Sequence, residues 1–177
     1  MSALRLINET EITSSVSSVD ITDVFSADFD IYQIEVTDFK RSTATDIWFY
    51  LRYINSAGSV VTASNYDYAF LQMRSDSAFG EFRGTNQSYS IYTIAGSSSG
   101  GAMSMFIFNP YSSSSYTFML NQHSLLDTTP NANMNGKQIN VLKQTSSISG
   151  FQLYSSSAGK GVDNAKIRTY GLRVDNG

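Results

Sequence analysis

Residues 29–36 read FDIYQIEV, and the alternation of apolar and polar side chains along this stretch decides the fold class. In an extended chain, successive side chains point to opposite faces. Tyr32, Ile34 and Val36 therefore share one face, and Gln33 and Glu35 share the other. This pattern predicts a β-strand with one buried face, and no helical periodicity persists anywhere in the chain.

The neighbouring stretch DIWFYLRYI, residues 46–54, is apolar or aromatic on both faces. It predicts a central strand that is covered on both sides, or one whose outer face meets a partner. Further segments of this kind recur between clusters of Gly, Asn, Ser and Pro, as expected for a single β-sandwich or barrel domain over residues 1–177 with about 9–11 short strands. The predicted strands are 4–7, 16–21, 29–36, 46–54, 66–74, 89–94, 102–109, 116–122, 137–143, 148–154 and 166–174.

Glycines give the most specific local predictions. Asn135-Gly136 favours a type I′ turn, so a tight hairpin is expected there. Gly150 and Gly171 fall inside strand patterns, where a glycine marks a bulge or a close backbone approach. The segment 159–161 is expected to be the tip of a hairpin, and pairing of the two flanking strands would close one side of the core.

Composition excludes several classes of function. The chain has no cysteine, which rules out disulfides, thiolate nucleophiles and cysteine-bound zinc. Its 12 Lys and Arg residues are scattered, so we expect no nucleic-acid binding. No apolar run approaches the ~20 residues of a membrane span, so we expect no membrane insertion. Only 15% of residues are charged, which suits a surface covered by neighbouring molecules.

Few residues suit catalysis. His123 is the one histidine, and we interpret it as a strand-end residue hydrogen-bonded to backbone rather than as a base or ligand. The pairs Asp20 with Asp23 and Asp28 with Asp30 are close enough in sequence to be considered for glycoside hydrolysis, and Asp28 with Asp30 also for calcium binding. Turn capping explains both pairs more simply. A Ser-His-Asp triad is not excluded by sequence, although no Gly-x-Ser-x-Gly motif supports one. We predict no enzyme, catalytic residue, cofactor or metal site.

Aromatic residues are the remaining chemical resource. A sugar-stacking platform, or a contact surface for a protein partner, could use Trp48, Tyr50, Tyr53, Tyr66 and Tyr68. Packing in the core or at an interface is the simpler explanation, because a sandwich of this length needs many large side chains inside.

Two segments of the chain carry a resemblance to known proteins. They are LINETEITSSVSSVDITDVF with DFDIYQI (6–25 and 28–34), and ISGFQLYSSS with KIRTYGLRV (148–157 and 166–174). Together they resemble a group of small virion proteins of tailed phages, many of them marine. The resemblance implies a lectin-like, jelly-roll-type antiparallel β-sandwich with adjacent first and last strands. It also implies a place in a virion assembled in the bacterial host cytoplasm, and it assigns no site residue.

The favoured hypothesis is therefore a structural virion protein, either a capsid decoration protein or a tail or fibre component, that contacts other virion proteins. We expect a homo-oligomer, with a trimer favoured. Met103 and Met105 alternate with Phe106 and Phe108, so one pair must face away from the core or into a second layer. We expect one such set at a subunit contact. The alternative is a fibre module that binds a glycan on the host surface.

Overall fold

The computed structural model describes residues 4–41, 48–77, 79–94, 100–127, 132–157 and 160–172. Within these residues the chain forms twelve strands and no helix. The strands are β1 (Leu4–Ile12), β2 (Ser18–Ile21), β3 (Ile31–Arg41), β4 (Trp48–Asn55), β5 (Tyr66–Arg74), β6 (Gly80–Gln87), β7 (Ser90–Ile94), β8 (Gly101–Phe108), β9 (Thr117–Asp127), β10 (Ala132–Leu142), β11 (Ile148–Ser155) and β12 (Val162–Leu172).

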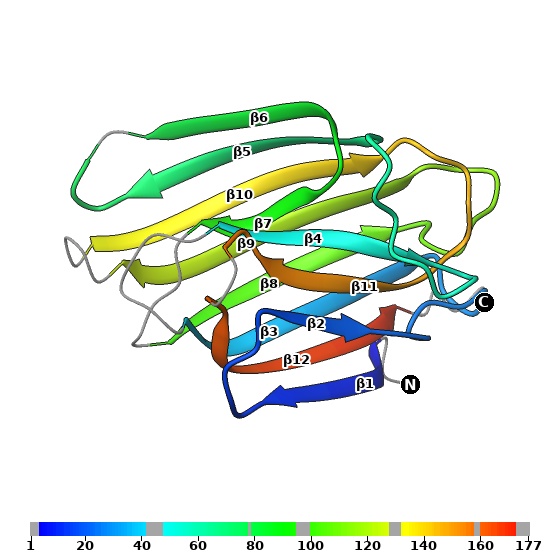
Figure 1. Cartoon of the computed structure of the whole chain (residues 1–177), viewed down its shortest axis with the longest axis horizontal. Helices are drawn as coiled ribbons and strands as arrows, with labels where there is room; N and C mark the ends of the chain where they lie inside the picture. The colour runs from blue at the N-terminus through cyan, green and yellow to red at the C-terminus, as the bar shows by residue number, and fades with distance from the viewer. Residues whose placement is uncertain are drawn as a thin grey trace.

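The strands form two antiparallel sheets that pack face to face (Figure 1). The large sheet has eight strands in the order β1-β12-β3-β8-β9-β10-β5-β6, and the small sheet has four in the order β2-β11-β4-β7. The predicted antiparallel β-sandwich is confirmed. One face of the large sheet, here called the inner face, packs against the small sheet, and the opposite face is called the outer face.

The core lies between the sheets and follows the predicted alternation. On β3, the side chains of Tyr32, Ile34 and Val36 are all fully buried. On β4, Phe49 and Leu51 reach into the same core from the small sheet. Inward positions on facing strands thus supply the apolar layer that holds the two sheets together.

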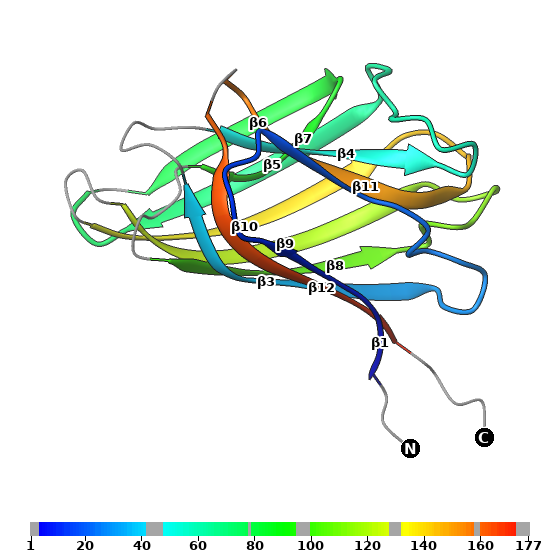
Figure 2. The ribbon, with the colours of Figure 1, turned by 60° about the horizontal axis from the view of Figure 1, so that its bottom comes forward.

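Strands from opposite ends of the described chain lie side by side. β1 pairs with β12, with Leu4 opposite Leu172, and β12 pairs in turn with β3 (Figure 2). The expected adjacency of the first and last strands is confirmed. The predicted strand ends at 46–47 and 173–174 lie outside the described residues.

The turn predicted at Asn135-Gly136 is wrong, because both residues lie inside β10, opposite Ser124 and His123 of β9. A Cβ on Gly136 would overlap the rings of Phe70 and His123. This glycine is therefore needed for space between two buried rings, and sequence alone does not distinguish that need from a turn.

The prediction that β11 and β12 pair is also wrong. β11 pairs with β2 and β4 in the small sheet, whereas β12 pairs with β1 and β3 in the large one. The close approach predicted at the two strand glycines is confirmed: a Cβ on Gly150 would overlap the Ile21 carbonyl, and one on Gly171 would lie 2.5 Å from the Phe29 ring. The first part of the predicted tip, up to residue 159, lies outside the described residues.

Strand β6 was not predicted, because its sequence contains Gly80 and the Gly84-Thr85-Asn86 group that usually marks turns. It is an edge strand that pairs with β5. A Cβ on Gly84 would lie 2.7 Å from the ring of Tyr68, so this glycine admits a neighbouring ring rather than a turn.

Candidate functional site

The five aromatic residues singled out in the sequence divide into two groups. Tyr53 and Tyr66 are 2% and 1% exposed, so neither can contact a ligand or partner, and that part of the prediction is corrected. The Tyr66 hydroxyl accepts a hydrogen bond from the Tyr53 backbone N–H and donates one to the Val61 carbonyl, which anchors it in the core. Trp48, Tyr50 and Tyr68 are half-buried and lie near one another.

These three residues belong to a larger aromatic cluster, defined here as Trp48, Tyr50, Tyr68, Phe82, Tyr89 and Tyr154. The Tyr50 and Tyr89 rings stack with centroids 4.1 Å apart, and the Tyr154 ring lies 5.4 Å from that of Tyr50. Trp48 packs edge-on against Phe82 at 5.3 Å. The sequence analysis missed Phe82, Tyr89 and Tyr154. These residues are distant in sequence from Trp48 and Tyr50, and only the strand pairing of the folded chain brings them together.

The aromatic cluster borders a shallow hollow of about 430 Å³, which Glu81 and Arg83 also line. Much of the ring surface is occupied within the cluster, because Tyr50 stacks on Tyr89 and the Arg52 guanidinium lies 4.5 Å from the Tyr154 centroid. Burial, aided by the nearby Tyr89, raises the pKa of Tyr50 to about 12. The Tyr50 phenol therefore stays neutral at physiological pH.

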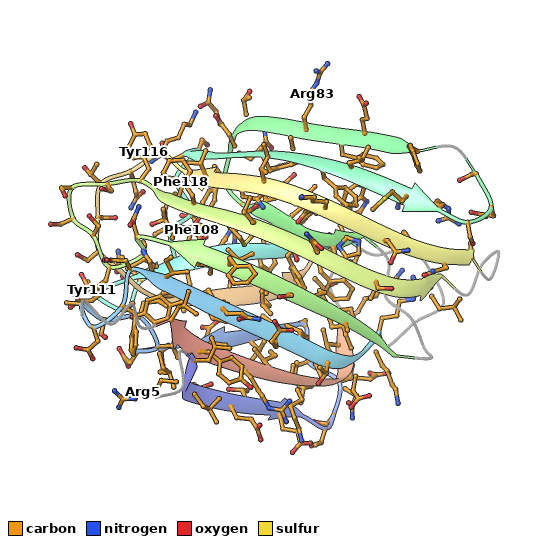
Figure 3. The ribbon with its side chains drawn as sticks, turned by 180° about the vertical axis from the view of Figure 1, so that it is seen from behind. Arg5, Arg83, Phe108, Tyr111, Tyr116 and Phe118 are labelled. Atoms are coloured by element: carbon orange, nitrogen blue, oxygen red, sulfur yellow. The ribbon has the colours of Figure 1, made fainter. Side chains whose placement is uncertain are left out.

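A second candidate surface covers one half of the outer face of the large sheet. Six apolar residues, one from each of six neighbouring strands, lie opposite one another in a continuous first row. In order across the sheet, this row is Leu4, Leu172, Ile31, Phe108, Phe118 and Val141. Figure 3 shows Phe108 and Phe118 next to each other on this face.

The second row runs beside the first, two residues further along each strand. It contains Leu6, Tyr170, Phe106, Leu120 and Ile139, with Gln33 as its one polar member between Tyr170 and Phe106. Ile139 is 56% exposed, Leu6 52%, Phe118 46% and Leu120 42%. The apolar residues of the two rows are called the apolar patch below.

The next row across the same strands is polar and is called the charged row: Glu9, Arg168, Glu35, Ser104, Gln122 and Lys137. Arg168 donates to the Glu9 carboxylate at 2.6 Å, which lowers the pKa of Glu9. Glu35 accepts hydrogen bonds from Ser104 at 2.6 Å and from Gln33 at 2.5 Å. The outer face thus changes from apolar to charged along the strand direction.

The pair Met103 and Met105 is buried, so Phe106 and Phe108 are the pair that faces away from the core, as the alternation required. Both phenylalanines belong to the apolar patch. Their place at a subunit contact stays a prediction.

On the inner face, β9 and β10 carry buried polar side chains. The Asn121 side-chain amide donates to the Tyr92 carbonyl at 2.5 Å and to Gln138 Oε1 at 2.8 Å. The Ser90 hydroxyl donates to Asn140 Oδ1. These contacts satisfy part of the hydrogen-bonding need of groups that are costly to bury.

His123 lies in the middle of β9 and is 4% exposed, so its interpretation as a strand-end residue bonded to backbone is wrong. Within the described residues, neither ring nitrogen has a hydrogen-bond partner, and the ring packs 5.4 Å from that of Phe70. Burial lowers the pKa of His123 to about 4, so the imidazole is neutral at physiological pH.

The two aspartate pairs form no acidic centre. Asp23 adopts a left-handed conformation with φ 56°, which aspartate tolerates in turns, and Asp28 and Asp30 are exposed in the loop before β3. Asp20 is exposed and accepts a hydrogen bond from Gln152 at 2.9 Å. In the described part of the chain, no three His, Cys, Asp or Glu residues gather as metal ligands would, and no helix there could span a bilayer.

No family model and no curated protein matches this sequence. Among solved structures, β-fructofuranosidase from Schwanniomyces occidentalis in complex with fructosyl-erythritol aligns over 97% of this chain, with 6% identity and a TM-score of 0.34. A family 7 alginate lyase in complex with substrate aligns over 82% of this chain, with 10% identity and a TM-score of 0.24. This chain spans 35% of the fructofuranosidase and 63% of the lyase. At such scores the likeness carries no information about substrate or mechanism.

Proposed function

We propose that this protein is a structural component of a tailed-phage particle, in the capsid decoration or the tail, that acts by protein–protein contacts made through the apolar patch. The observation that carries the proposal is the patch itself, which crosses six strands and includes four large side chains more than 40% exposed. Soluble monomers rarely expose a contiguous apolar surface of more than a few hundred Å², and larger ones mark interaction sites.

The inner face of the same strands supports this proposal. β9 and β10 bury Asn121, Gln138 and Asn140 while they expose Phe118, Leu120 and Ile139. If water covered the outer face of this sheet, the arrangement would be unfavourable, because polar side chains are buried inside while apolar side chains stay in water. It becomes favourable when a partner removes the outer side chains from water. The resemblance to phage virion proteins and the low charge of the chain point to an assembly as the source of that partner.

The test uses the variant Leu120→Lys/Ile139→Lys, which places two charges in the middle of the patch. Particles of a phage that encodes the chain are purified, and the chain is quantified in them by mass spectrometry. We expect wild type in the particles and the double variant in the unassembled fraction. Phe79→Lys is the matched control, because Phe79 is 71% exposed but lies outside the patch.

Two outcomes contradict the proposal. One is that wild-type chain never occurs in particles. The other is that the double variant enters them as well as wild type and Phe79→Lys do. Circular dichroism of the purified variants confirms that all of them keep the β-sandwich.

A second candidate function is glycan binding at the aromatic cluster. It is favoured by the hollow in which Trp48, Tyr50 and Tyr89 lie beside Glu81 and Arg83, a mixture of ring faces and charged groups suited to sugars. A glycan array tests it: specific hits that Trp48→Ala abolishes support it, and an array without hits removes it.

A further inference from the structure

We propose that the apolar patch binds a second copy of this chain, face to face, about a two-fold axis that lies in the interface and runs along the strands between β8 and β9. The proposal rests on the proposed function in using the same surface, and it names the partner. It follows from the order of side chains across the outer face.

A two-fold axis parallel to the strands keeps each row opposite itself and reverses the order of the strands. β8 of one copy then faces β9 of the other, and β3 faces β10. In the charged row, Glu35 on β3 therefore lies opposite Lys137 on β10 of the second copy, and Ser104 lies opposite Gln122. Over β3, β8, β9 and β10, the charged row of one copy therefore faces groups of opposite charge or matching polarity in the charged row of the other.

The same axis sets most of the central apolar side chains opposite apolar ones, with Gln33 opposite Ile139 and Leu172 opposite Asp67 as the exceptions. In the second row, Phe106 lies opposite Leu120, and in the first row Phe108 lies opposite Phe118. The large ring of Tyr170 on β12 lies opposite Ala69 on β5, the two strands being equally far from the axis. Ala69 lines an open hollow of about 540 Å³ together with Leu71 and Ile139, so a bulky side chain meets a depression.

The area is sufficient for a stable dimer. The six strands centred on this axis are β12, β3, β8, β9, β10 and β5. With strands about 4.8 Å apart and same-face residues about 7 Å apart, three rows on these strands cover on the order of 600 Å² in projection. Side-chain relief raises the accessible area toward the roughly 800 Å² per partner of a standard interface. An apolar centre with a polar rim is the usual composition of such an interface.

Other symmetries fit the surface less well. A two-fold axis across the strands would place each strand opposite itself, so that Glu35 and Lys137 never meet. A three-fold ring needs two different complementary patches on each copy, whereas the outer face offers one patch that complements itself. The proposal thus takes a dimer for this surface, whereas the trimer expected from the sequence stays a prediction for the chain.

The experiment measures the molar mass of the isolated chain by light scattering from micromolar to near-millimolar concentration. We expect a dimer that dissociates on dilution. Glu35→Lys should raise the dissociation constant about 10- to 100-fold, because two symmetry-related contacts become repulsive. The exchange Glu35→Lys/Lys137→Glu should return it to within about threefold of wild type.

Asp20→Lys is the matched control, since it changes the net charge equally on the small sheet, and it should leave the dimer unchanged. Leu120→Lys should give a monomer throughout. The self-pairing is overturned by a wild-type monomer at every concentration, or by a charge exchange that does not restore the dimer. A trimer at saturation overturns it as well.

These results are separable from those on the proposed function. A monomeric chain that enters particles, while Leu120→Lys/Ile139→Lys does not, rejects self-pairing and leaves the virion role intact with another protein on the patch. A dimer that is absent from particles rejects the virion role and retains self-pairing.

Discussion

Strand β3 and the strand pair β9–β10 lie in the same sheet but distribute their side chains differently. β3 buries Tyr32, Ile34 and Val36 completely and turns Gln33 and Glu35 outward. β9 and β10 bury several amide side chains and expose leucine, isoleucine and phenylalanine. Over residues 32–36, β3 therefore keeps its apolar side chains inside the sandwich, whereas β9 and β10 also carry large apolar side chains on their outer face.

The difference teaches that alternation fixes the period of a strand but not the face that turns inward. In β9 the large apolar residues Phe118 and Leu120 point outward, while Asn121 and His123 point inward. Asn121 is held there by its hydrogen bonds to Gln138 and to the Tyr92 carbonyl, whereas His123 is held by packing against Phe70. A strand with apolar side chains outside and polar ones inside is a more specific sign of a contact surface than the overall composition of the chain.

The largest expected effect compares the two strands directly. Ile34→Ala should lower the free energy of unfolding by about 2–5 kcal/mol, because it leaves a cavity in the core. Leu120→Ala should cost about 1 kcal/mol or less in the monomer, because the side chain is 42% exposed. Urea unfolding at low protein concentration measures both, and equal losses would remove the distinction between the faces.

The inner polar groups of β9 predict a pH effect. The pKa of His123 falls from 6.5 when unfolded to about 4 when folded, so the unfolded chain binds more protons between these values. Stability should therefore fall as the pH drops from about 6.5 to 4, by roughly 3 kcal/mol in all.

His123→Met introduces an apolar side chain of similar size that does not titrate. It should therefore flatten the dependence of the free energy of unfolding on pH between about 4 and 6.5. Glu9, Asp67 and Asp76 have lowered pKa values and act at more acidic pH, so they do not mimic this effect. Urea midpoints across the pH range decide the matter, and a variant with the wild-type slope would show that His123 is not responsible.

The amide pair on the inner face predicts a smaller loss. Asn121→Ala should cost about 1–3 kcal/mol, because it leaves Gln138 and the Tyr92 carbonyl buried without this partner. Replacing Asn121 and Gln138 together by leucine should cost less than the sum of the two single changes. A double-mutant cycle checks this, and strict additivity would mean that the two amides are not coupled.

The smallest effect belongs to the charged row. Glu9→Gln removes the carboxylate that pairs with Arg168, but both groups are at the surface. Exposed ion pairs contribute little, so the urea midpoint should not change measurably. A clear loss of stability would indicate that the row does more than border the apolar patch.

The sequence predicts the period-two strands and the sandwich, because β3 and β5 carry their signal locally. It groups Trp48, Tyr50 and Tyr68 correctly, but it adds Tyr53 and Tyr66, which are buried in the core. It also misses Tyr89 and Tyr154, which arrive through long-range pairing. It fails at Gly136 and β6, where a glycine needed for space resembles a turn. The apolar patch cannot be read from local sequence either, since its rows exist only after six strands are in register.

The pairing of β1 with β12 bears on how the protein is made. Residue 4 finds its partner only when residue 172 has been synthesised, so the loop to be closed spans almost the whole described chain. Contacts this distant in sequence form slowly. The apolar patch on the nascent chain therefore stays incomplete until β12 has been synthesised and has paired with β1 and β3.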